Sequence, residues 1–595
     1  MYILGVLSFF QMVFIPGFLL LKLAGEQFKI SEDKNPLIDA VYCFALSLLI
    51  NYLLVFGLTA AGIYKPITLY LLLIIEGIAL VWYWIRHGHQ TINLDFKRLS
   101  NTWNEFITSR TLGYNLLFIL SCAVIVWYVF LFFYFMGDVF EHWDPVVGWN
   151  RFALDWAANR FPVNTYRYPQ LIPSNWSMSY VLMQNTDIQC FAKSIMAFFP
   201  IGILLVFLSA GIKEKKSAYL LALIIYGPLI GYIYEPSYVV SGYVDIAVSF
   251  FAFLSFYAMR KGSDRMAIVF ACAASVTKQA GLFFLGFILI WAFLRLIKRR
   301  QSLSFKKVLT AVALSLVAVL LITASWYVMK EIQIRSGQDI SEFGLTQKAN
   351  VSPHHLERLS SALERLSTLH HPKLRFFIYA IFALILLGIF HRESRGATLL
   401  ISIPYFLLWG LLFSYDNRNL APAIPFASYS AAFGFEFLKR QLPAPEKCRP
   451  FKLPVLMILV PMILLVIAAN FTVFNNQSLI DHQIQKTKKI GDTELNDLLY
   501  AYQAKEGLTG KIATTYQYLG YLPGLKPFYL RKPGRITPRF LDFLDTPEGK
   551  EIHYLLMPVI EKSETEVYTR VREKITSGAY RLIFRWRGYH FIKIR

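Results

Sequence analysis

Cysteine is scarce in this chain of 595 residues, and the five that occur are scattered. They are Cys43, Cys122, Cys190, Cys272 and Cys448. Their number is odd, their spacing is wide, and most of them lie in apolar stretches. This pattern predicts neither a disulfide framework nor the closely spaced ligands of a zinc site. We interpret the cysteines as packing residues.

Charged residues are also few, at 16% of the sequence against 56% for hydrophobic residues, and the mean hydropathy is +0.45. Apolar stretches long enough to cross a bilayer recur from the first residue to about residue 474. This composition predicts a polytopic integral membrane protein. A basic leader is lacking, and Tyr2 to Leu23 is long enough to span, so we expect a retained first helix.

Acidic residues are outnumbered, with 38 Asp and Glu against 60 Lys and Arg, which gives a net charge of +22. Nucleic-acid-binding proteins share such a charge. Here, however, the basic residues cluster in short segments between apolar runs, as they do in cytoplasmic loops. We therefore predict no nucleic-acid partner and use these segments to orient the chain. The same rule places residues 138–190, residues 331–373 and the tail after Asn475 on the exterior side.

The apolar runs predict an all-α polytopic fold with roughly fourteen membrane spans. They lie near residues 2–24, 37–61, 66–85, 113–136, 192–211, 217–234, 239–259, 265–277, 280–297, 306–329, 374–390, 397–413, 420–437 and 453–474. We expect three parts along the chain. These are N-terminal transmembrane helices in 1–112, a larger transmembrane domain in 113–474 with exterior loops 137–190 and 331–373, and an exterior domain in 475–595.

The tail has a different pattern from the rest of the chain. Helical periodicity covers Thr493 to Lys505, and Gly588 separates the last two strand-like runs as the turn of a hairpin would. The strand-like runs are residues 512–518, 553–558, 580–585 and 590–594. The tail is therefore predicted to be a small α/β domain.

Three carboxylates and a histidine lie where a long apolar helix ends, in the segment Asp138-Val-Phe-Glu141-His142-Trp143-Asp144. One interpretation is that these acids only mark the membrane interface. The other is functional. Three acids within seven residues repel one another, and a partly buried carboxylate in such a group suits a general base or a cation ligand.

Further polar segments follow on the same predicted side of the membrane. They are Trp149-Asn150-Arg151, Tyr168-Pro169-Gln170-Leu171-Ile172-Pro173, Gly242-Tyr243-Val244-Asp245-Ile246, Thr277-Lys278-Gln279-Ala280-Gly281, and Tyr415-Asp416-Asn417-Arg418-Asn419-Leu420-Ala421-Pro422. Their order resembles that of the C-type (GT-C) glycosyltransferases, which include protein O-mannosyltransferase-like and aminoarabinose-transferase-like enzymes. The resemblance covers roughly residues 113–440. It has two departures, since Pro145 follows Asp144 where a glutamate is commoner, and Asn419 replaces a more usual aromatic residue.

The resemblance implies an inverting transfer of a sugar from a polyprenyl-phosphate donor to a hydroxyl of a glycan, lipid or protein acceptor. It implies Asp144 as general base, with Asp138 and Glu141 as second choices for base, metal ligand or support. The donor phosphate would be held by Arg418, Lys278 and Arg151, because cations stabilise a departing phosphate by charge-assisted hydrogen bonds. Sugar or acceptor contacts would come from Tyr243, Asp245, Trp149, Asn150, Tyr168, Tyr415 and Asp416.

Each of these residues also has a simpler interpretation. Arg418 and Lys278 lie at predicted helix ends, where basic side chains commonly reach the membrane interface. Asp245 is equally expected as the partner that neutralises a buried cation. Glu76, near the middle of a predicted span, is either functional or part of a structural hydrogen bond, and the structural role is favoured.

The sequence leaves the metal question and two other functions open. A divalent ion at the acidic segment is possible in this chemistry, and two His pairs at 354–355 and 370–371 flank a predicted amphipathic helix too long for one ion to join them. A lipid-linked glycan ligase would rely more on residues 331–373. A transporter or flippase would instead favour ionisable groups in mid-membrane. The absence of endoplasmic-reticulum signals favours a bacterial inner membrane.

Overall fold

The structure is a computed structural model that describes most of the chain. The described residues are 2–28, 35–87, 111–135, 139–233, 239–299, 305–339, 355–368, 375–413, 416–441, 490–522, 524–529, 540, 543–547, 549–558 and 566–595. The chain divides into two compact units, and each is described by itself. The membrane unit comprises Met1–Gly137 with Phe152–Ser478, and the C-terminal unit comprises Asp138–Arg151 with Leu479–Arg595.

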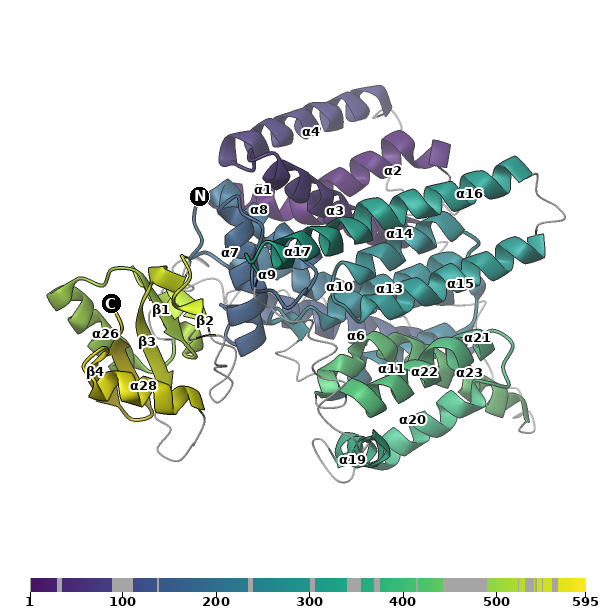
Figure 1. The fold of residues 1–595 in the computed structure, drawn as a ribbon. Coiled ribbons are helices and arrows are strands. Elements are labelled where there is room, and N and C mark those ends of the chain that lie inside the picture. The colour runs from purple at the N-terminus through teal and green to yellow at the C-terminus, as the bar shows by residue number, and fades with distance from the viewer. Residues whose placement is uncertain are drawn as a thin grey trace. The chain divides into compact units, whose positions relative to one another are not determined.

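The helices of the membrane unit follow the apolar runs of the sequence. The first are α1 (Tyr2–Val13), α2 (Ile15–Phe28), α3 (Pro36–Ala60), α4 (Pro66–His87) and α6 (Leu112–Phe135). The middle ones are α7 (Arg151–Ala157), α8 (Leu171–Met183), α9 (Cys190–Ser194), η2 (Ile195–Ala197), α10 (Phe198–Glu214), α11 (Ser217–Ile233), α13 (Asp245–Arg260), α14 (Asp264–Ser275) and α15 (Gly281–Arg299). The last are α16 (Phe305–Ala318), η4 (Val319–Ala324), α17 (Ser325–Arg335), α19 (His355–Thr368), α20 (Arg375–Leu387), α21 (Arg395–Ala397), η6 (Thr398–Ser402), α22 (Ile403–Leu408), η7 (Trp409–Phe413), η8 (Asn417–Ala423) and α23 (Ile424–Gln441). The long helices of this unit run side by side (Figure 1).

Six of the described helices are long and apolar enough to cross a membrane, or seven if the pair Tyr2–Val13 and Ile15–Leu23, bent by 43°, forms one span. The polytopic membrane character predicted from the sequence is therefore confirmed. The predicted count of about fourteen is not confirmed. Residues 453–474 lie outside the described residues, and several other predicted spans form helices of 10–17 residues, such as Ser217–Ile233. At 1.5 Å per residue such helices are shorter than a hydrocarbon core of about 30 Å.

Local sequence explains where a long span begins. Asn35 precedes α3, and its side-chain oxygen accepts a hydrogen bond from the backbone nitrogen of Leu37. Pro36 occupies the first position of the helix, where its missing N–H costs nothing. The apolar run that follows then buries much of α3 against its neighbours.

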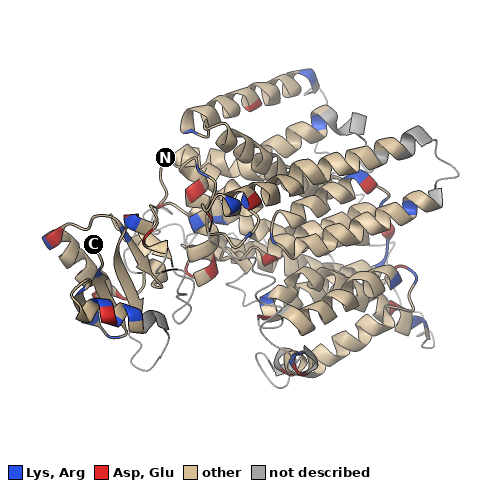
Figure 2. Ribbon diagram, viewed as in Figure 1, with Lys and Arg blue, Asp and Glu red and all other residues tan. Residues whose placement is uncertain are grey.

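Charged residues of the membrane unit lie mostly at helix ends and in the connections between helices, whereas the helix middles carry few (Figure 2). One set of ends is tied by ion pairs. Lys261 pairs with Glu214 (Nζ–Oε1 2.8 Å), and Arg260 pairs with Glu393 (Nη2–Oε2 3.1 Å). All four residues lie in short connections between the predicted spans.

Glu76 is the acid that the sequence places in the middle of a span. Its Oε1 accepts a hydrogen bond from Gln11 Nε2 at 3.2 Å. Asn51 accepts from the same Gln11 nitrogen at 3.2 Å and donates back to the Gln11 carbonyl at 3.0 Å. These contacts join α1, α3 and α4, as expected for the structural interpretation of Glu76.

A fully buried ion pair joins Lys330 of α17 to Asp339, which lies just beyond the end of that helix. The side chains of Lys330 and Asp339 pair with each other and are both 0% exposed. Lys330 Nζ also donates to the Pro162 carbonyl (2.9 Å) and to Gln333 Oε1 (2.6 Å), while Asp339 Oδ2 accepts from the backbone nitrogen of Asn164 (3.0 Å). The pair therefore fastens the connection between α7 and α8 to the end of α17.

The C-terminal unit contains a five-stranded sheet in the order β2-β1-β3-β5-β4. Its elements are α26 (Thr493–Glu506), β1 (Lys511–Thr514), η9 (Gln517–Tyr521), β2 (Pro527–Tyr529), η10 (Gly549–Glu551), β3 (Ile552–Pro558), α28 (Glu566–Thr576), β4 (Arg581–Trp586) and β5 (Tyr589–Lys593), together with η1 (Asp144–Asn150). β1 is parallel to β2 and β3, whereas β5 is antiparallel to β3 and β4. The small α/β domain predicted from the tail is confirmed.

Alternating residues of this sheet fill two hydrophobic cores, one on each face. Ala513 and Leu555 belong to the core that contains Val571 of α28, and their neighbours Ile512 and Leu556 belong to the core that contains Leu495 of α26. This alternation follows from the two-residue period of a strand. The predicted hairpin turn is also present, because Trp586 pairs with Tyr589 across two residues.

Candidate functional site

Asp245 and Lys278 meet in the membrane unit. Asp245 is the first residue of α13, and Lys278 lies in the turn between α14 and α15. Lys278 Nζ donates to Asp245 Oδ1 at 2.5 Å and to Asn419 Oδ1 at 3.2 Å. The side chain of Asp245 is 4% exposed and that of Lys278 is 16% exposed. A buried carboxylate needs such a partner, and its place at a helix N-terminus stabilises it further.

The turn that carries Lys278 requires glycine at its end. A Cβ on Gly281 would lie 2.0 Å from the carbonyl oxygen of Ala274. Only a residue without a side chain lets α15 begin so close to the end of α14. The Thr277–Gly281 segment therefore has a local reason for its sequence, and the turn presents Lys278 toward α13 and η8.

Arg418 lies in the short helix η8, which Asp416 caps. Asp416 Oδ1 accepts from the backbone nitrogen of Arg418 (2.9 Å), and its Oδ2 accepts from Arg418 Nε (2.8 Å) and pairs with Nη2. The guanidinium carbon lies 3.9 Å from the ring centroid of Tyr243. A bidentate carboxylate and an aromatic face together fix the orientation of the guanidinium plane.

Side chains from neighbouring helices hold η8 in place. Tyr405 donates to the Asn419 carbonyl (3.1 Å), Trp409 Nε1 to the Asp416 carbonyl (3.2 Å), and Ser249 of α13 to the Ala421 carbonyl (3.0 Å). Asn419 stands where the resemblance leads one to expect an aromatic residue. In the structure it is the residue that links η8 to Lys278.

Electrostatics show that these groups act on one another. Burial by itself would raise the pKa of the Asp416 carboxyl, but hydrogen bonds and charge from Arg418, with a contribution from Lys278, outweigh it and hold that pKa below its usual 3.8. The Asp416 carboxylate is thus ionised at neutral pH. Two cations and two carboxylates, from three separate segments of the sequence, form what we call the Lys278–Arg418 cluster, consisting of Tyr243, Asp245, Lys278, Asp416, Arg418 and Asn419.

A pH prediction follows from the lowered pKa of Asp416. The stabilisation that its charge provides is present above the usual value of 3.8 and is lost as pH falls through the lower folded-state pKa. We expect the difference in thermal midpoint between the wild type and Asp416→Asn to stay constant from pH 8 to 5 and to shrink below about pH 4. Asparagine keeps the cap on η8, so the comparison isolates the charge. A difference that persists unchanged to pH 3 would contradict the assignment.

Tyr168 lies in a connection with unusual backbone conformations. Four of its non-glycine residues have positive φ, at Asn159 (55°), Asn164 (54°), Tyr166 (54°) and Arg167 (56°). Such conformations are costly and persist only where surrounding contacts impose them. Gln279 Nε2, next to Lys278, donates to the Tyr166 carbonyl at 2.9 Å. Sequence reasoning did not single out Gln279, yet it joins this connection to the turn that carries Lys278.

The acidic segment belongs to the C-terminal unit. Glu141 and Asp144 are exposed, and Asp144 begins η1, where Val146 N donates to the His142 carbonyl at 3.0 Å. Trp149 and Asn150 are buried at 5% and 4% exposure. Arg151 Nε donates to the Val147 carbonyl at 3.1 Å. Asp138 and Tyr415, two other candidates from the sequence, lie outside the described residues.

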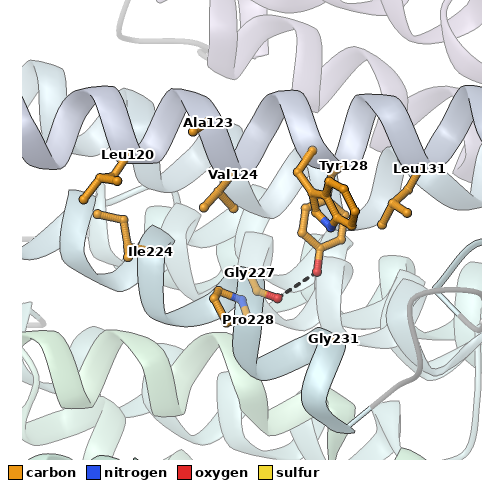
Figure 3. A pocket seen from close by; sticks show the side chains of 10 residues that line it. Leu120, Ala123, Val124, Tyr128, Leu131, Ile224, Gly227, Pro228 and Gly231 are labelled. Atoms are coloured by element: carbon orange, nitrogen blue, oxygen red, sulfur yellow. Dashed lines mark hydrogen bonds between the residues drawn. The ribbon is translucent and has the colours of Figure 1, made fainter. Parts of the chain in front are cut away.

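An apolar cavity of about 450 Å³ lies between α6 and α11 (Figure 3). It is lined by residues such as Val124, Trp127, Ile224 and Pro228, and Tyr128 donates to the Gly227 carbonyl at 2.8 Å beside it. None of the candidate site residues lines this cavity. Its apolar lining offers no group for acid, base or phosphate chemistry, so we do not assign the reaction to it.

A metal site is not found in the part of the chain that the structure describes, where no group of three or more His, Cys, Asp or Glu is placed to hold an ion. The described cysteines Cys43, Cys122, Cys190 and Cys272 form no disulfide. His354, His370 and His371 lie outside the described residues.

Comparisons with known proteins give a likeness of fold. No family model matches the chain, and no curated protein matches it. Among solved structures, ArnT from Cupriavidus metallidurans in the apo state is similar, with 13% sequence identity and a TM-score of 0.47. The match covers 81% of this chain and 98% of that chain. At this identity the likeness concerns the backbone alone and assigns no role to any residue.

Proposed function

We propose that this protein is a membrane glycosyltransferase of the C type that transfers a sugar from a polyprenyl-phosphate-linked donor to a hydroxyl acceptor. The observation that carries the proposal is the Lys278–Arg418 cluster. Three segments that resemble the family in sequence, around Tyr243, Lys278 and Arg418, contact one another in the membrane unit. Their convergence brings Lys278 and Arg418 together with two carboxylates.

The cluster suits the departure of a lipid phosphate. Cleavage of the bond between sugar and phosphate leaves a phosphate whose negative charge must be stabilised. Arg418 and Lys278 supply donors for charge-assisted hydrogen bonds, and their carboxylate partners hold them in position before the donor binds. Arg151 is a further candidate for the phosphate. We assign the sugar or acceptor contacts to Tyr243, Asp245, Asp416 and the other residues that the resemblance implies.

We assign the general base to Asp144. Attack at the anomeric carbon with inversion needs a group that takes the proton of the acceptor hydroxyl, and a carboxylate serves this purpose. Asp144 is exposed at the start of η1, where it can meet a substrate. Glu141 is the alternative within the same segment. The proposal also places the active site and the C-terminal unit on the exterior side of a bacterial inner membrane.

The experiment that tests this function is transfer of radiolabelled sugar from a panel of polyprenyl-phosphate sugars by the purified full chain, with a membrane extract as acceptor. Labelled product with one donor would support the proposal and identify the sugar. If no donor gives product while the labelled donor itself crosses liposomes that contain the protein, the flippase function would replace it. Transfer of a whole lipid-linked oligosaccharide instead of a single sugar would favour the ligase.

The same assay provides a prediction for Arg418. Arg418→Gln should lower transfer by about 10²–10³-fold, because loss of one preorganised donor for a developing charge has about this effect. The matched control is Arg440→Gln, an exposed arginine paired with Glu436 one turn away on α23. We expect the control to remain within about threefold of the wild type, since exposed pairs contribute little. Equal activity of both variants would remove Arg418 from the site.

A further inference from the structure

The acidic segment is held by the C-terminal unit through side chains of η9. Tyr521 donates its hydroxyl proton to the Phe140 carbonyl at 2.6 Å, and Gln517 Nε2 donates to the Glu141 carbonyl at 2.9 Å. The partners are separated by 381 and 376 residues in sequence. Residues 138–151 accordingly group with the tail and not with the membrane helices that flank them.

The element η9 is itself fixed to the sheet. Tyr529 of β2 donates to the Gln517 carbonyl (2.9 Å) and accepts from Gly520 N (3.0 Å). A Cβ on Gly520 would lie 2.6 Å from the Tyr529 hydroxyl, so this contact depends on glycine. Burial raises the pKa of the Tyr529 phenol, and the charge of Arg151 opposes that rise. Arg151, at the far end of the segment, therefore also lies near β2.

These contacts restrain the backbone a few residues before Asp144. The Phe140 and Glu141 carbonyls are anchored four and three residues before it, and the His142 carbonyl accepts a hydrogen bond from Val146 N of η1. The Asp144 backbone lies between an anchored end and a helical turn. Its orientation is then set by η9 and not by local sequence alone.

We propose that the C-terminal unit positions the candidate base, with Tyr521 and Gln517 as positioning residues for Asp144. The inference rests on the proposed function in so far as Asp144 acts in transfer. It adds that the tail of the chain is part of the transfer machinery, because it sets the geometry of a segment that lies more than three hundred residues earlier.

The test combines two readouts on the full chain carrying Tyr521→Phe, Gln517→Met or both. Hydrogen–deuterium exchange of residues 139–151 reports whether the segment is held, independently of activity. Each single variant should raise exchange in this segment about 2- to 10-fold, as loss of one hydrogen bond predicts, and the double variant should raise it more. Exchange in β3 and β5 should stay unchanged, which shows that the unit remains folded.

Transfer kinetics are the second readout. A looser base lowers kcat, so kcat should fall by a similar factor. KM for the donor should change less than kcat, because Lys278 and Arg418, which are proposed for its phosphate, lie outside the segment. Tyr500→Phe is the matched control. This half-buried tyrosine of α26 packs against the core that contains Leu495, away from the contacts of Tyr521 and Gln517 with the segment. It should change neither readout.

The outcomes separate this inference from the proposed function. Unchanged exchange in both single variants and in the double variant would overturn the inference whatever the activity. Raised exchange with unchanged kcat would overturn the positioning role. If the wild type transfers no sugar, the proposed function fails, and the role in transfer fails with it. The exchange data would then still decide whether the segment is anchored.

Discussion

Asp144→Asn is expected to lower sugar transfer by about 10²–10⁴-fold, the range by which positioned general bases accelerate reactions. Asparagine has nearly the same size as aspartate, but its amide cannot take the proton of an acceptor hydroxyl. The side chain is exposed at the start of η1, so the substitution removes no buried packing. Single-turnover transfer from a radiolabelled donor measures the chemical step directly. Asp144→Glu, which restores the carboxylate at a changed distance, should retain more activity than Asp144→Asn.

Glu141→Gln is the matched control for this prediction. Glu141 is an exposed acid of the same segment, and its backbone carbonyl, unlike its side chain, is the group that Gln517 holds. We expect this variant to stay within about tenfold of the wild type, because it leaves the assigned base in place. If Glu141→Gln abolishes transfer and Asp144→Asn does not, the base is Glu141. Loss of transfer in both variants would indicate that the two carboxylates act together.

Removal of either partner of the Lys330–Asp339 pair is expected to cost about 3–5 kcal/mol of stability, because it leaves an uncompensated buried charge. Both side chains are 0% exposed, so water cannot replace the missing partner. Lys330→Met and Asp339→Asn keep the approximate volumes of the side chains. The asparagine also keeps an oxygen that can accept from the Asn164 backbone nitrogen. Chemical unfolding of the purified protein in detergent measures the loss.

The double variant tests whether the pair acts as a unit. Lys330→Met with Asp339→Asn removes both charges, so its cost should be well below the sum of the two single costs. The double variant should remain about 1–3 kcal/mol less stable than the wild type, since the Pro162 carbonyl and Gln333 Oε1 lose their donor. The exposed pair Arg440–Glu436 is the control, where a single substitution should cost about 0–1 kcal/mol. Additive costs at the buried pair would show that the two charges do not interact.

Some of the local structure could be read from the sequence because its causes are local. Helix α26 is an example, since it runs over Thr493–Glu506, close to the predicted Thr493 to Lys505. The hairpin of β4 and β5 is another. β2 was missed because it has only three residues, and its pairing with β1 comes from elsewhere in the chain. A strand that short has too few positions to show a period.

The candidate site could likewise be predicted from the sequence only in part. The sequence identified the segments around Tyr243, Lys278 and Arg418 as separate polar segments. Their order along the chain did not predict which of their side chains are in contact. Lys278 contacts Asp245 and Asn419 across 33 and 141 residues. Neither Gln279 as a support of Tyr166 nor Asp339 as the partner of Lys330 could be inferred, because a single polar residue has no periodic signal. Such pairings depend on how helices pack.

The sequence by itself determined that this is a helical membrane protein with a small α/β tail, since hydrophobic run length, periodicity and caps act over a few residues. Tertiary structure alone decided that residues 138–151 group with that tail, and that three distant segments form the Lys278–Arg418 cluster. The physical reason is the range of the interactions. Helices and strands form from neighbouring residues, whereas the partner of a buried charge or a loop carbonyl is set by the packing of whole elements.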